Sequence, residues 1–310
     1  MSAPPLFSIV IPTYNRAKLL KKAVQSVIDQ TFQDWELIIV DDGSSDNTRA
    51  IIQAYTDRRI RYFFQEHQER STARNFGISH ASGRYVCFMD DDDYILEHHL
   101  QVFFDALSKD GFPVKIYRNG FYFEKGNKRT KGPVYDPELH PNPVYFAAFN
   151  FCSACSLCIP KVCLKDQLFP EAFPYWEDTH LILRLLIKYT FQQNNNFTYI
   201  YQLHPDRNSQ LNYRTQGVNE KVVLNVEAIR HFFLKYGKDF QQLLPQWTED
   251  FLIAEKYLGY ANNALLQRAW KRSISFFVTS IRASSLHFLT WQYFKYILKL
   301  PLKFFFNIPG

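Results

Sequence analysis

Short apolar runs alternate with amphipathic stretches along the N-terminal part of the chain. The runs are rich in β-branched residues and poor in charge, which is typical of strands buried on both faces of a sheet. The stretches between them place apolar residues along one side of a helix. The predicted strands are 7–14, 35–42, 60–65 and 84–90, and the predicted helices are 16–30, 48–55 and 69–81. This βαβαβαβ order predicts a mostly parallel sheet with helices on both faces.

The pattern is less regular in the middle of the chain and becomes purely helical towards its end. A run that begins near Val114 and turns at Gly126 and Asn127 predicts a hairpin. Further predicted elements are a strand at 154–160, a helix at 177–189 and a strand at 197–203. Later periodicity predicts helices at 216–236, 243–258, 260–270 and 272–284. We therefore expect an α/β domain over residues 1–215 and an all-helical extension over residues 216–310.

The composition favours a folded protein with an anionic partner. Of the 310 residues, 46% are hydrophobic and 21% are charged, which allows a large core and argues against global disorder. The formal net charge of +6 suits a nucleotide, a nucleic acid or a lipid surface without choosing among them. The start, MSAPPLFSIVIP, lacks a basic segment and a cleavage site, so we expect no signal peptide. No uncharged apolar run reaches the ~18 residues that a spanning helix needs.

The cysteines predict a reducing compartment. There are five, an odd number without a secretory context, so free thiols in the cytoplasm are expected. Cys155 and Cys158 lie in a predicted strand and Cys152 lies just before it; residues three apart on a strand point to opposite faces. We therefore expect small buried side chains here, with a zinc site as the less favoured alternative.

Two clusters of aspartates follow predicted strands. Asp41 and Asp42 come at the end of the second strand, and Asp90 to Asp93 at the end of the fourth. These strand ends meet at the edge where open α/β sheets bind ligands. Four adjacent like charges repel one another, which favours a bound cation at Asp90 and Asp92. Turn and helix capping is the alternative for Asp42 and Asp46, and a solvated helix cap is the alternative for Asp93.

The first strand–helix turn, PTYNR, contains no glycine. A dinucleotide-binding turn needs glycines so that the backbone can approach a pyrophosphate, and the sequence contains no P-loop either. A nucleotide bound at this sheet therefore needs another group to neutralise its diphosphate. A divalent cation held by carboxylates is the natural substitute.

Four blocks of the sequence resemble family 2 glycosyltransferases, which have the GT-A fold. The blocks are FSIVIPTYNR, ELIIVDDGSSDNT, STARNFGISHASGRYVCFMDDDDY and WEDTHLILRL, in the usual order and spacing. The resemblance covers about residues 6–210, and the last hundred residues carry no comparable signature. It implies a Rossmann-like, mostly parallel sheet and an inverting transfer of a sugar from a nucleoside-diphosphate sugar, with UDP as the expected nucleotide.

The resemblance also implies roles in nucleotide binding. Pro12 and Tyr14 match positions that pack against the base. Asp42 matches the aspartate that accepts a hydrogen bond from the base. Arg74 matches an arginine that lies near the nucleotide.

The DxD motif of the family is matched by Asp90, Asp91 and Asp92. Its first aspartate normally meets the ribose or metal-bound water, and its second, here Asp92, ligates Mn²⁺ or Mg²⁺. Because Asp91 and Asp93 form a second DxD, the register stays open. His204, in YQLHPDRNS, matches a late histidine that approaches the metal or the diphosphate, and a structural histidine is the alternative.

The segment WEDTH resembles the acidic pair whose second carboxylate is the catalytic base, which points to Asp178. The chemistry of an inverting transfer agrees, because one base must take a proton from the acceptor hydroxyl as it attacks the anomeric carbon. A metal stabilises the nucleoside diphosphate that leaves. Helix capping by Glu177 or Asp178 is the structural alternative. Arg184 fits an arginine that often follows the pair, and a structural ion pair explains it equally well.

Two other functions fit part of the sequence. A nucleotidyltransferase also uses paired aspartates and a metal, but it usually has a glycine-rich basic loop that PTYNR lacks. A non-catalytic sugar-nucleotide-binding or membrane scaffold protein would not need Asp178 and both DxD aspartates. The expected partners are therefore a nucleoside-diphosphate sugar and a saccharide or lipid-linked acceptor, in the synthesis of a cell-surface polysaccharide. No nucleic acid is expected.

The end of the chain combines aromatic and basic residues. Within residues 286–310, Lys295, Lys299 and Lys303 recur on one side of an expected helix that Pro301 would kink. Bulky aromatics around the remaining sides favour a helix lying in an anionic membrane interface, with a helix packed on the protein as the alternative. We expect a cytoplasmic protein attached by this segment to the inner face of the cytoplasmic membrane, without a spanning helix.

Overall fold

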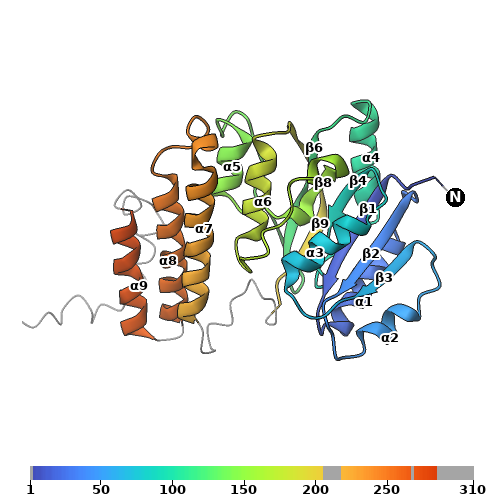
Figure 1. Ribbon diagram of the computed structural model, residues 1–310, viewed down its shortest axis with the longest axis horizontal. Helices are drawn as coiled ribbons and strands as arrows, with labels where there is room; N and C mark the ends of the chain where they lie inside the picture. The colour runs from blue at the N-terminus through green and yellow to red at the C-terminus, as the bar shows by residue number, and fades with distance from the viewer. Residues whose placement is uncertain (1–2, 205–217, 267–268, 285–310) are drawn as a thin grey trace, which may run out of the picture. The chain divides into compact units, whose positions relative to one another are not determined.

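The computed structural model describes residues 3–204, 218–266 and 269–284. The chain divides into two compact units, Met1–Gln210 and Leu211–Gly310. The first unit mixes strands and helices and the second is helical, which confirms the predicted fold class (Figure 1). The segment 286–310 lies outside the described residues, so its docking on a membrane stays a prediction.

One sheet organises the first unit, with the strand order β3-β2-β1-β4-β8-β6-β9-β5 and β7 paired to β6. The four strands at one end pair in parallel, as predicted: β1 (Phe7–Thr13), β2 (Trp35–Asp41), β3 (Ile60–Phe64) and β4 (Tyr85–Phe88). Every residue of β1, β2 and β4 is buried. The connecting helices are α1 (Ala17–Ile28), α2 (Thr48–Gln53) and α3 (Arg70–His80). Because such crossovers are right-handed, α1 and α2 cover one face and α3 covers the other.

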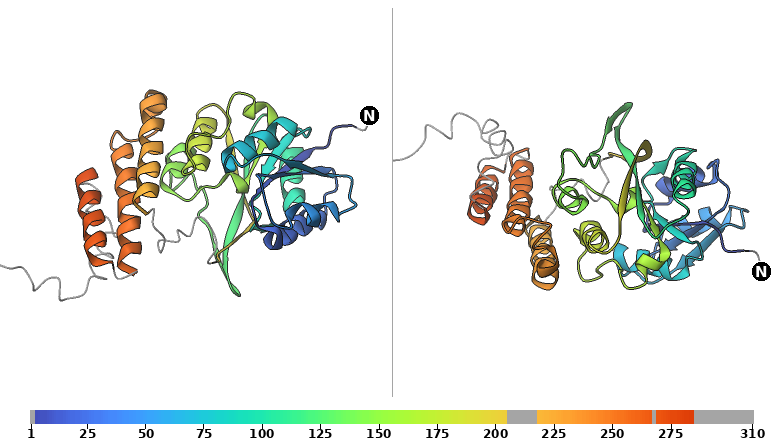
Figure 2. Two further views of the ribbon diagram at one scale, coloured as in Figure 1. Left: turned by 60° about the horizontal axis from the view of Figure 1, so that its bottom comes forward. Right: turned by 90° about the horizontal axis from the view of Figure 1, so that it is seen from above.

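The other half of the sheet is mixed rather than parallel. Its strands are β5 (Tyr94–Ile95), β6 (Ile116–Lys125), β7 (Lys128–Lys131), β8 (Leu157–Pro160) and β9 (Phe191–Gln202). β8 runs antiparallel between β4 and β6, whereas β9 runs parallel to β6. The predicted turn joins β6 to β7 at Gly126, whose φ is 57°, and this hairpin extends past the neighbouring strands (Figure 2).

Several elements differ from the sequence-based prediction. The helices α4 (His99–Lys109) and α5 (Pro143–Phe149) were not predicted. Cys155 lies in a 3₁₀ turn (Ala154–Ser156) rather than in a strand, because β8 begins only at Leu157. Cys152, Cys155 and Cys158 are nevertheless buried and free, as expected of small core side chains.

The second unit contains α7 (Val218–Phe240), α8 (Thr248–Leu266) and α9 (Trp270–Ala283). The two helices predicted at 243–258 and 260–270 are one helix, α8, which runs through Gly259. A single glycine costs a helix only about 1 kcal/mol, and Leu258, Ala261 and Leu265 on either side of it pack into one core. In the part of the chain that the structure describes, no helix is long and apolar enough to cross a membrane.

Three helices at the carboxyl edge of the sheet follow a residue with positive φ. Asn15 (φ 52°) precedes the start of α1, Glu69 (φ 81°) precedes α3, and Trp176 (φ 64°) precedes α6 (Glu177–Leu186). Glu69 also has ψ 159°, a region that only glycine adopts freely, at a cost of about 1–3 kcal/mol for other residues. The Asp42 carboxylate holds this conformation by accepting the Glu69 N–H at 3.0 Å.

Replacing Glu69 by glycine should therefore stabilise the protein. Glycine adopts this backbone without a steric penalty but costs roughly 0.5–1 kcal/mol more to order, so we expect a net gain of about 1 kcal/mol in the free energy of unfolding. Urea unfolding followed by far-UV circular dichroism measures it. Glu69→Ala is the control, because it removes the carboxylate and keeps the strain. If the glycine variant is no more stable than the alanine variant, the strain assignment is wrong.

Candidate active site

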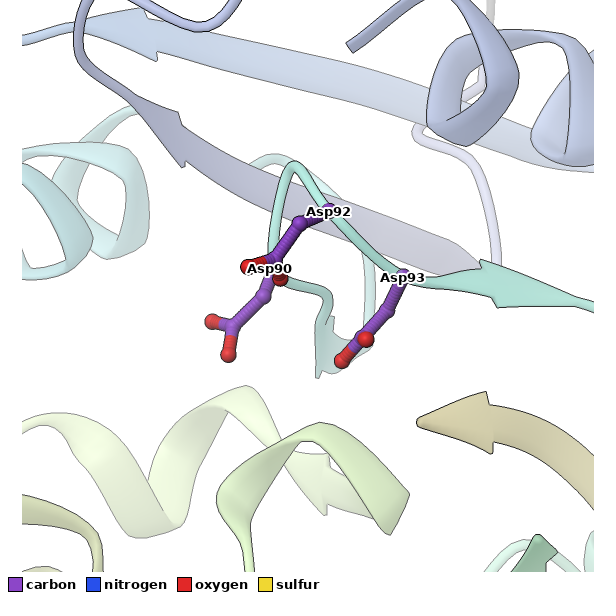
Figure 3. Close-up of side chains that lie close together, drawn as sticks. All are labelled: Asp90, Asp92 and Asp93. Carbon is purple, nitrogen blue, oxygen red and sulfur yellow. The ribbon is translucent and has the colours of Figure 1, made fainter. Parts of the chain in front are cut away.

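The loop after β4 carries Asp90 to Asp93 at the carboxyl end of the parallel strands. Oxygens of Asp90, Asp92 and Asp93 lie within 4.8 Å of one another, and Figure 3 shows the three side chains directed to the same side of the loop. Asp91 to Asp93 are buried and Asp90 is partly exposed. Carboxylate oxygens at this spacing suit a hard divalent cation such as Mg²⁺ or Mn²⁺.

Two arginines from other parts of the chain balance part of this negative charge. Arg74, in α3, places Nη2 2.7 Å from Asp90 Oδ1. Arg16, at the start of α1, places Nη1 3.1 Å from Asp91 Oδ1 and 2.9 Å from Asp92 Oδ2. The repulsion that favoured a bound cation in the sequence is thus already reduced by the protein's own guanidinium groups.

Asp91 and Asp92 have different surroundings. The Thr13 hydroxyl donates to Asp91 Oδ2 at 2.8 Å, and burial raises the pKa of Asp91 to about 7 although Arg16 opposes this. His204 Nε2 lies 3.1 Å from Asp92 Oδ2, so the two residues expected at the metal lie together. The cluster of close carboxylates holds Asp90, Asp92 and Asp93, and so the last aspartate of either DxD register, which leaves the register open.

Asp93 is not the solvated helix cap that the sequence suggested. It is fully buried, and the Tyr199 hydroxyl donates to its Oδ2 at 2.8 Å. The Gln202 N–H donates to its Oδ1 at 2.9 Å. Both partners belong to β9, and α4 begins only at His99, so Asp93 fastens the aspartate loop to the mixed half of the sheet.

The acidic pair Glu177 and Asp178 lies in the first turn of α6. Arg74 Nη1 is 3.1 Å from Asp178 Oδ1 and 3.4 Å from Glu177 Oε1, so one buried arginine joins the aspartate loop to the acidic pair. The Ser153 hydroxyl donates to Asp178 Oδ2 at 3.0 Å. Arg70 pairs with Glu177 at 3.0 Å. Both carboxylate oxygens of Asp178 are therefore held in place. Glu177 pairs with Arg70 and also with Arg74.

Burial raises the pKa of Asp178 to about 6; Arg74 opposes this rise, and Glu177 and Asp90 add to it. A carboxylate with a pKa just below neutrality is well suited to accept a proton and is still ionised at pH 7.

This pKa predicts the pH dependence of a transfer in which Asp178 is the base. The ionised form is lost as the pH falls through about 6, so kcat/KM should decline below that pH with a slope of one. Because Glu177 raises the pKa of Asp178, Glu177→Gln should move this limb to lower pH. Initial rates between about pH 5 and pH 8 measure both profiles. If the pH at which kcat/KM declines is the same in the variant, a group other than Asp178 titrates.

The residues expected to contact the nucleotide base lie at the ends of β1 and β2. Pro12 is buried in β1, and Tyr14 is exposed and stacks on His67 with ring centroids 4.1 Å apart. Asp42 is buried, accepts a hydrogen bond from Gln65 at 2.6 Å and lies 2.8 Å from His67 Nδ1. Asp42 thus holds the loop before α3 in this structure, and its hydrogen bond with the nucleotide base stays a prediction.

The loop before α6 is anchored from two helices. Asn75, beside Arg74 in α3, donates to the Phe169 carbonyl at 3.0 Å and accepts the Phe169 N–H at 2.9 Å. Arg184 donates to Gln167 at 3.1 Å and to the Leu168 carbonyl. Arg184 therefore supports the backbone that leads to the acidic pair.

Sequence reasoning missed several residues of this site. Arg16 had a usable signal, because it is a cation in the turn after β1, at an edge that carries two acidic clusters. Thr13, Ser153 and Tyr199 had none, since a hydroxyl in or beside a buried strand looks the same in sequence whether or not it meets a carboxylate.

Comparison with known proteins adds a family match. The family model described as glycosyl transferase family 2 matches residues 8–163. An uncharacterized glycosyltransferase of Rickettsia typhi is 31% identical over 193 residues, which are 59% of this chain and 59% of that protein. The GalNAc(5)-diNAcBac-PP-undecaprenol beta-1,3-glucosyltransferase of Campylobacter jejuni is 30% identical over 199 residues, 62% of this chain and 63% of that protein. Less than two thirds of either relative is thus covered.

The UDP-Glc:alpha-D-GlcNAc-diphosphoundecaprenol beta-1,3-glucosyltransferase WfgD of Escherichia coli is 30% identical over 184 residues, 58% of this chain and 70% of that protein. Among solved structures, S. aureus TarS 1-349 in complex with UDP-GlcNAc aligns with 90% of this chain and 83% of its own, with a TM-score of 0.66 and 19% identity. At that identity the likeness concerns the fold, and it confirms the expected GT-A architecture.

Proposed function

The chain belongs to glycosyl transferase family 2, and on this premise we propose that it is a metal-dependent, inverting glycosyltransferase that moves a sugar from a UDP-sugar to a lipid-linked saccharide. One observation supports this most strongly. Arg74, which is 1% exposed, lies 2.7 Å from Asp90 and 3.1 Å from Asp178. Asp90, from the cluster suited to hold a cation, and Asp178, which is suited to accept a proton, therefore both contact Arg74.

In this proposal Asp178 is the catalytic base. Its carboxylate takes the proton of the acceptor hydroxyl while that oxygen forms the new bond to the anomeric carbon and the bond to the nucleoside diphosphate breaks. Arg74 and Ser153 fix its two oxygens, so it meets the hydroxyl in a defined orientation. A single base suffices because inversion needs no covalent intermediate.

In this proposal a cation held by the aspartate cluster would neutralise the nucleoside diphosphate that leaves. Asp92 would hold a divalent cation, with Asp90, Asp93 and His204 around it. Bound there, Mn²⁺ or Mg²⁺ supplies the positive charge that the departing diphosphate requires. Asp93 also keeps the loop in position through Tyr199 and Gln202.

The names of the relatives support the choice of substrates. The Campylobacter jejuni protein is named for an undecaprenol-linked acceptor, and the Escherichia coli protein for UDP-Glc and a diphosphoundecaprenol acceptor. The TarS structure holds UDP-GlcNAc. We extend these properties to this chain as part of the proposal, together with docking of residues 286–310 on an anionic membrane surface.

A donor screen tests the proposed function. The full chain is incubated with UDP-Glc, UDP-Gal, UDP-GlcNAc and GDP-Man, with Mn²⁺ or with EDTA, and release of the free nucleoside diphosphate is measured. We expect release from at least one UDP-sugar with Mn²⁺ and none with EDTA. Pyrophosphate formed from UTP and a sugar 1-phosphate would identify a nucleotidyltransferase instead. No turnover of any donor, with an undecaprenyl-linked acceptor present, would favour a binding protein.

A further inference from the structure

The turn between β1 and α1 is fixed in a way that sends Arg16 towards the aspartates. Asn15 has a left-handed backbone, its N–H donates to the Ser44 hydroxyl at 2.8 Å, and its side-chain oxygen accepts the Ser45 N–H at 2.8 Å. The backbone that carries Arg16 is therefore fastened to the loop after β2. Only the long side chain can change position, and it is 20% exposed.

Arg16 and the expected cation compete for the same carboxylate. Arg16 Nη1 lies 2.9 Å from Asp92 Oδ2, and His204 Nε2 approaches the same oxygen at 3.1 Å. A divalent cation bound to this oxygen would stand within a few ångströms of the guanidinium, and two cations at that separation repel each other strongly in a buried site. A guanidinium and a cation on this oxygen therefore oppose each other.

Arg74 shows the contrast between a fixed and a movable arginine. Its side chain is 1% exposed and lies between Asp90, Glu177 and Asp178, so it has no room to leave. The side chain of Arg16 is 20% exposed, so it is less enclosed than Arg74. A guanidinium that leaves these carboxylates can pair with the oxygens of a phosphate group, which it binds as well as it binds carboxylates.

We propose that Arg16 is an exchangeable counter-charge at the aspartate cluster. It neutralises Asp91 and Asp92 in the empty enzyme, leaves Asp92 when a divalent cation binds, and then pairs with the diphosphate of the donor. The proposal rests on the proposed function, which supplies the cation and the diphosphate. It makes the binding of cation and nucleotide cooperative, because each ligand favours the released position of Arg16, and this coupling must be reciprocal.

Calorimetric titration of the full chain tests this, with Mn²⁺ alone, with Mn²⁺ at saturating UDP, and with UDP at saturating Mn²⁺. Arg16→Gln should bind Mn²⁺ alone at least about tenfold more tightly than the unaltered protein, because no guanidinium has to be displaced. It should bind UDP with Mn²⁺ at least about fivefold more weakly, because the phosphate contact is lost. Lys21→Gln, which removes one exposed charge from α1, is the matched control and should leave both affinities within about twofold.

An Arg16→Gln variant that binds Mn²⁺ alone no more tightly, with unchanged circular dichroism, overturns the proposal and leaves the proposed function standing. Arg16→Lys covers the case in which the glutamine variant does not fold. A lysine lacks the planar fork of a guanidinium and holds carboxylates less firmly, so Mn²⁺ alone should again bind more tightly, and an unchanged affinity overturns the proposal as well. If the unaltered protein binds no Mn²⁺ even with UDP, metal dependence itself falls and this proposal falls with it.

Discussion

Asp178→Asn binds UDP in the presence of Mn²⁺ as the unaltered protein does, yet transfers sugar at least ~10²-fold more slowly. Asparagine has the shape of aspartate and can still accept a hydrogen bond from Arg74 or Ser153, so the site keeps its geometry. It cannot take a proton from the acceptor hydroxyl. Steady-state rates with a lipid-linked acceptor, together with calorimetric UDP affinity, measure the two properties separately.

Glu177→Gln is the matched control for this result. Glu177 lies next to Asp178 and shares Arg74 with it, but it also pairs with Arg70 at 3.0 Å. Its variant should lose less than about tenfold in rate at pH 7, because the base itself remains. Near-normal turnover of Asp178→Asn would place the base elsewhere, and equal losses in both variants would indicate a structural role for the whole pair.

Asp92→Ala should differ from Asp178→Asn, because it removes donor binding as well as turnover. The Mn²⁺-dependent part of the UDP affinity should fall by more than about tenfold, since even outer-shell changes at metal sites cost 10–100-fold. Transfer should be undetectable. Calorimetric titration of UDP with Mn²⁺ and with EDTA measures the effect, and circular dichroism checks the fold.

Asp105→Ala controls for the lost charge, because Asp105 is exposed on α4. It should leave UDP affinity and transfer unchanged. If Asp92→Ala keeps its Mn²⁺-dependent affinity, the ligand belongs to the register of Asp91 and Asp93, or no metal binds there. Asp178→Asn and Asp92→Ala are both inactive in these predictions, and only the second loses the donor, so the pair separates chemistry from binding.

The parallel half of the sheet could be predicted from the sequence because its signals are local. β1, β2 and β4 are short runs buried on both faces, and each predicted boundary lies within two residues of the observed one. The acids at the ends of these strands followed from the same pattern. The mixed half could not be predicted, because the pairing of β6 with β8 and β9 depends on segments far apart in the chain, and side-chain periodicity carries no information on strand order.

The motifs selected the acids of the candidate site and one of their counter-charges, Arg74, but not the other, Arg16. Asp90, Asp92, Asp178 and His204 were selected from motifs, and the structure brings Asp90 and Asp92 together with His204 beside Asp92. Arg16 neutralises part of the charge that, in the sequence, favoured a bound cation. Whether an arginine meets a carboxylate more than seventy residues away depends on the fold, which local pattern does not encode.

The two partners of Asp93 also set the order in which the protein can be completed. Tyr199 and Gln202 follow Asp93 by 106 and 109 residues. At about 5–20 residues per second of synthesis, β9 leaves the ribosome roughly 5–20 seconds after the aspartate loop. Until then the nascent chain cannot bury Asp93 with both of its hydrogen bonds, and an unpaired carboxylate resists burial. Closure of the aspartate loop is therefore among the last steps in the folding of the first unit, and a chain truncated before β9 would keep its acidic loop open.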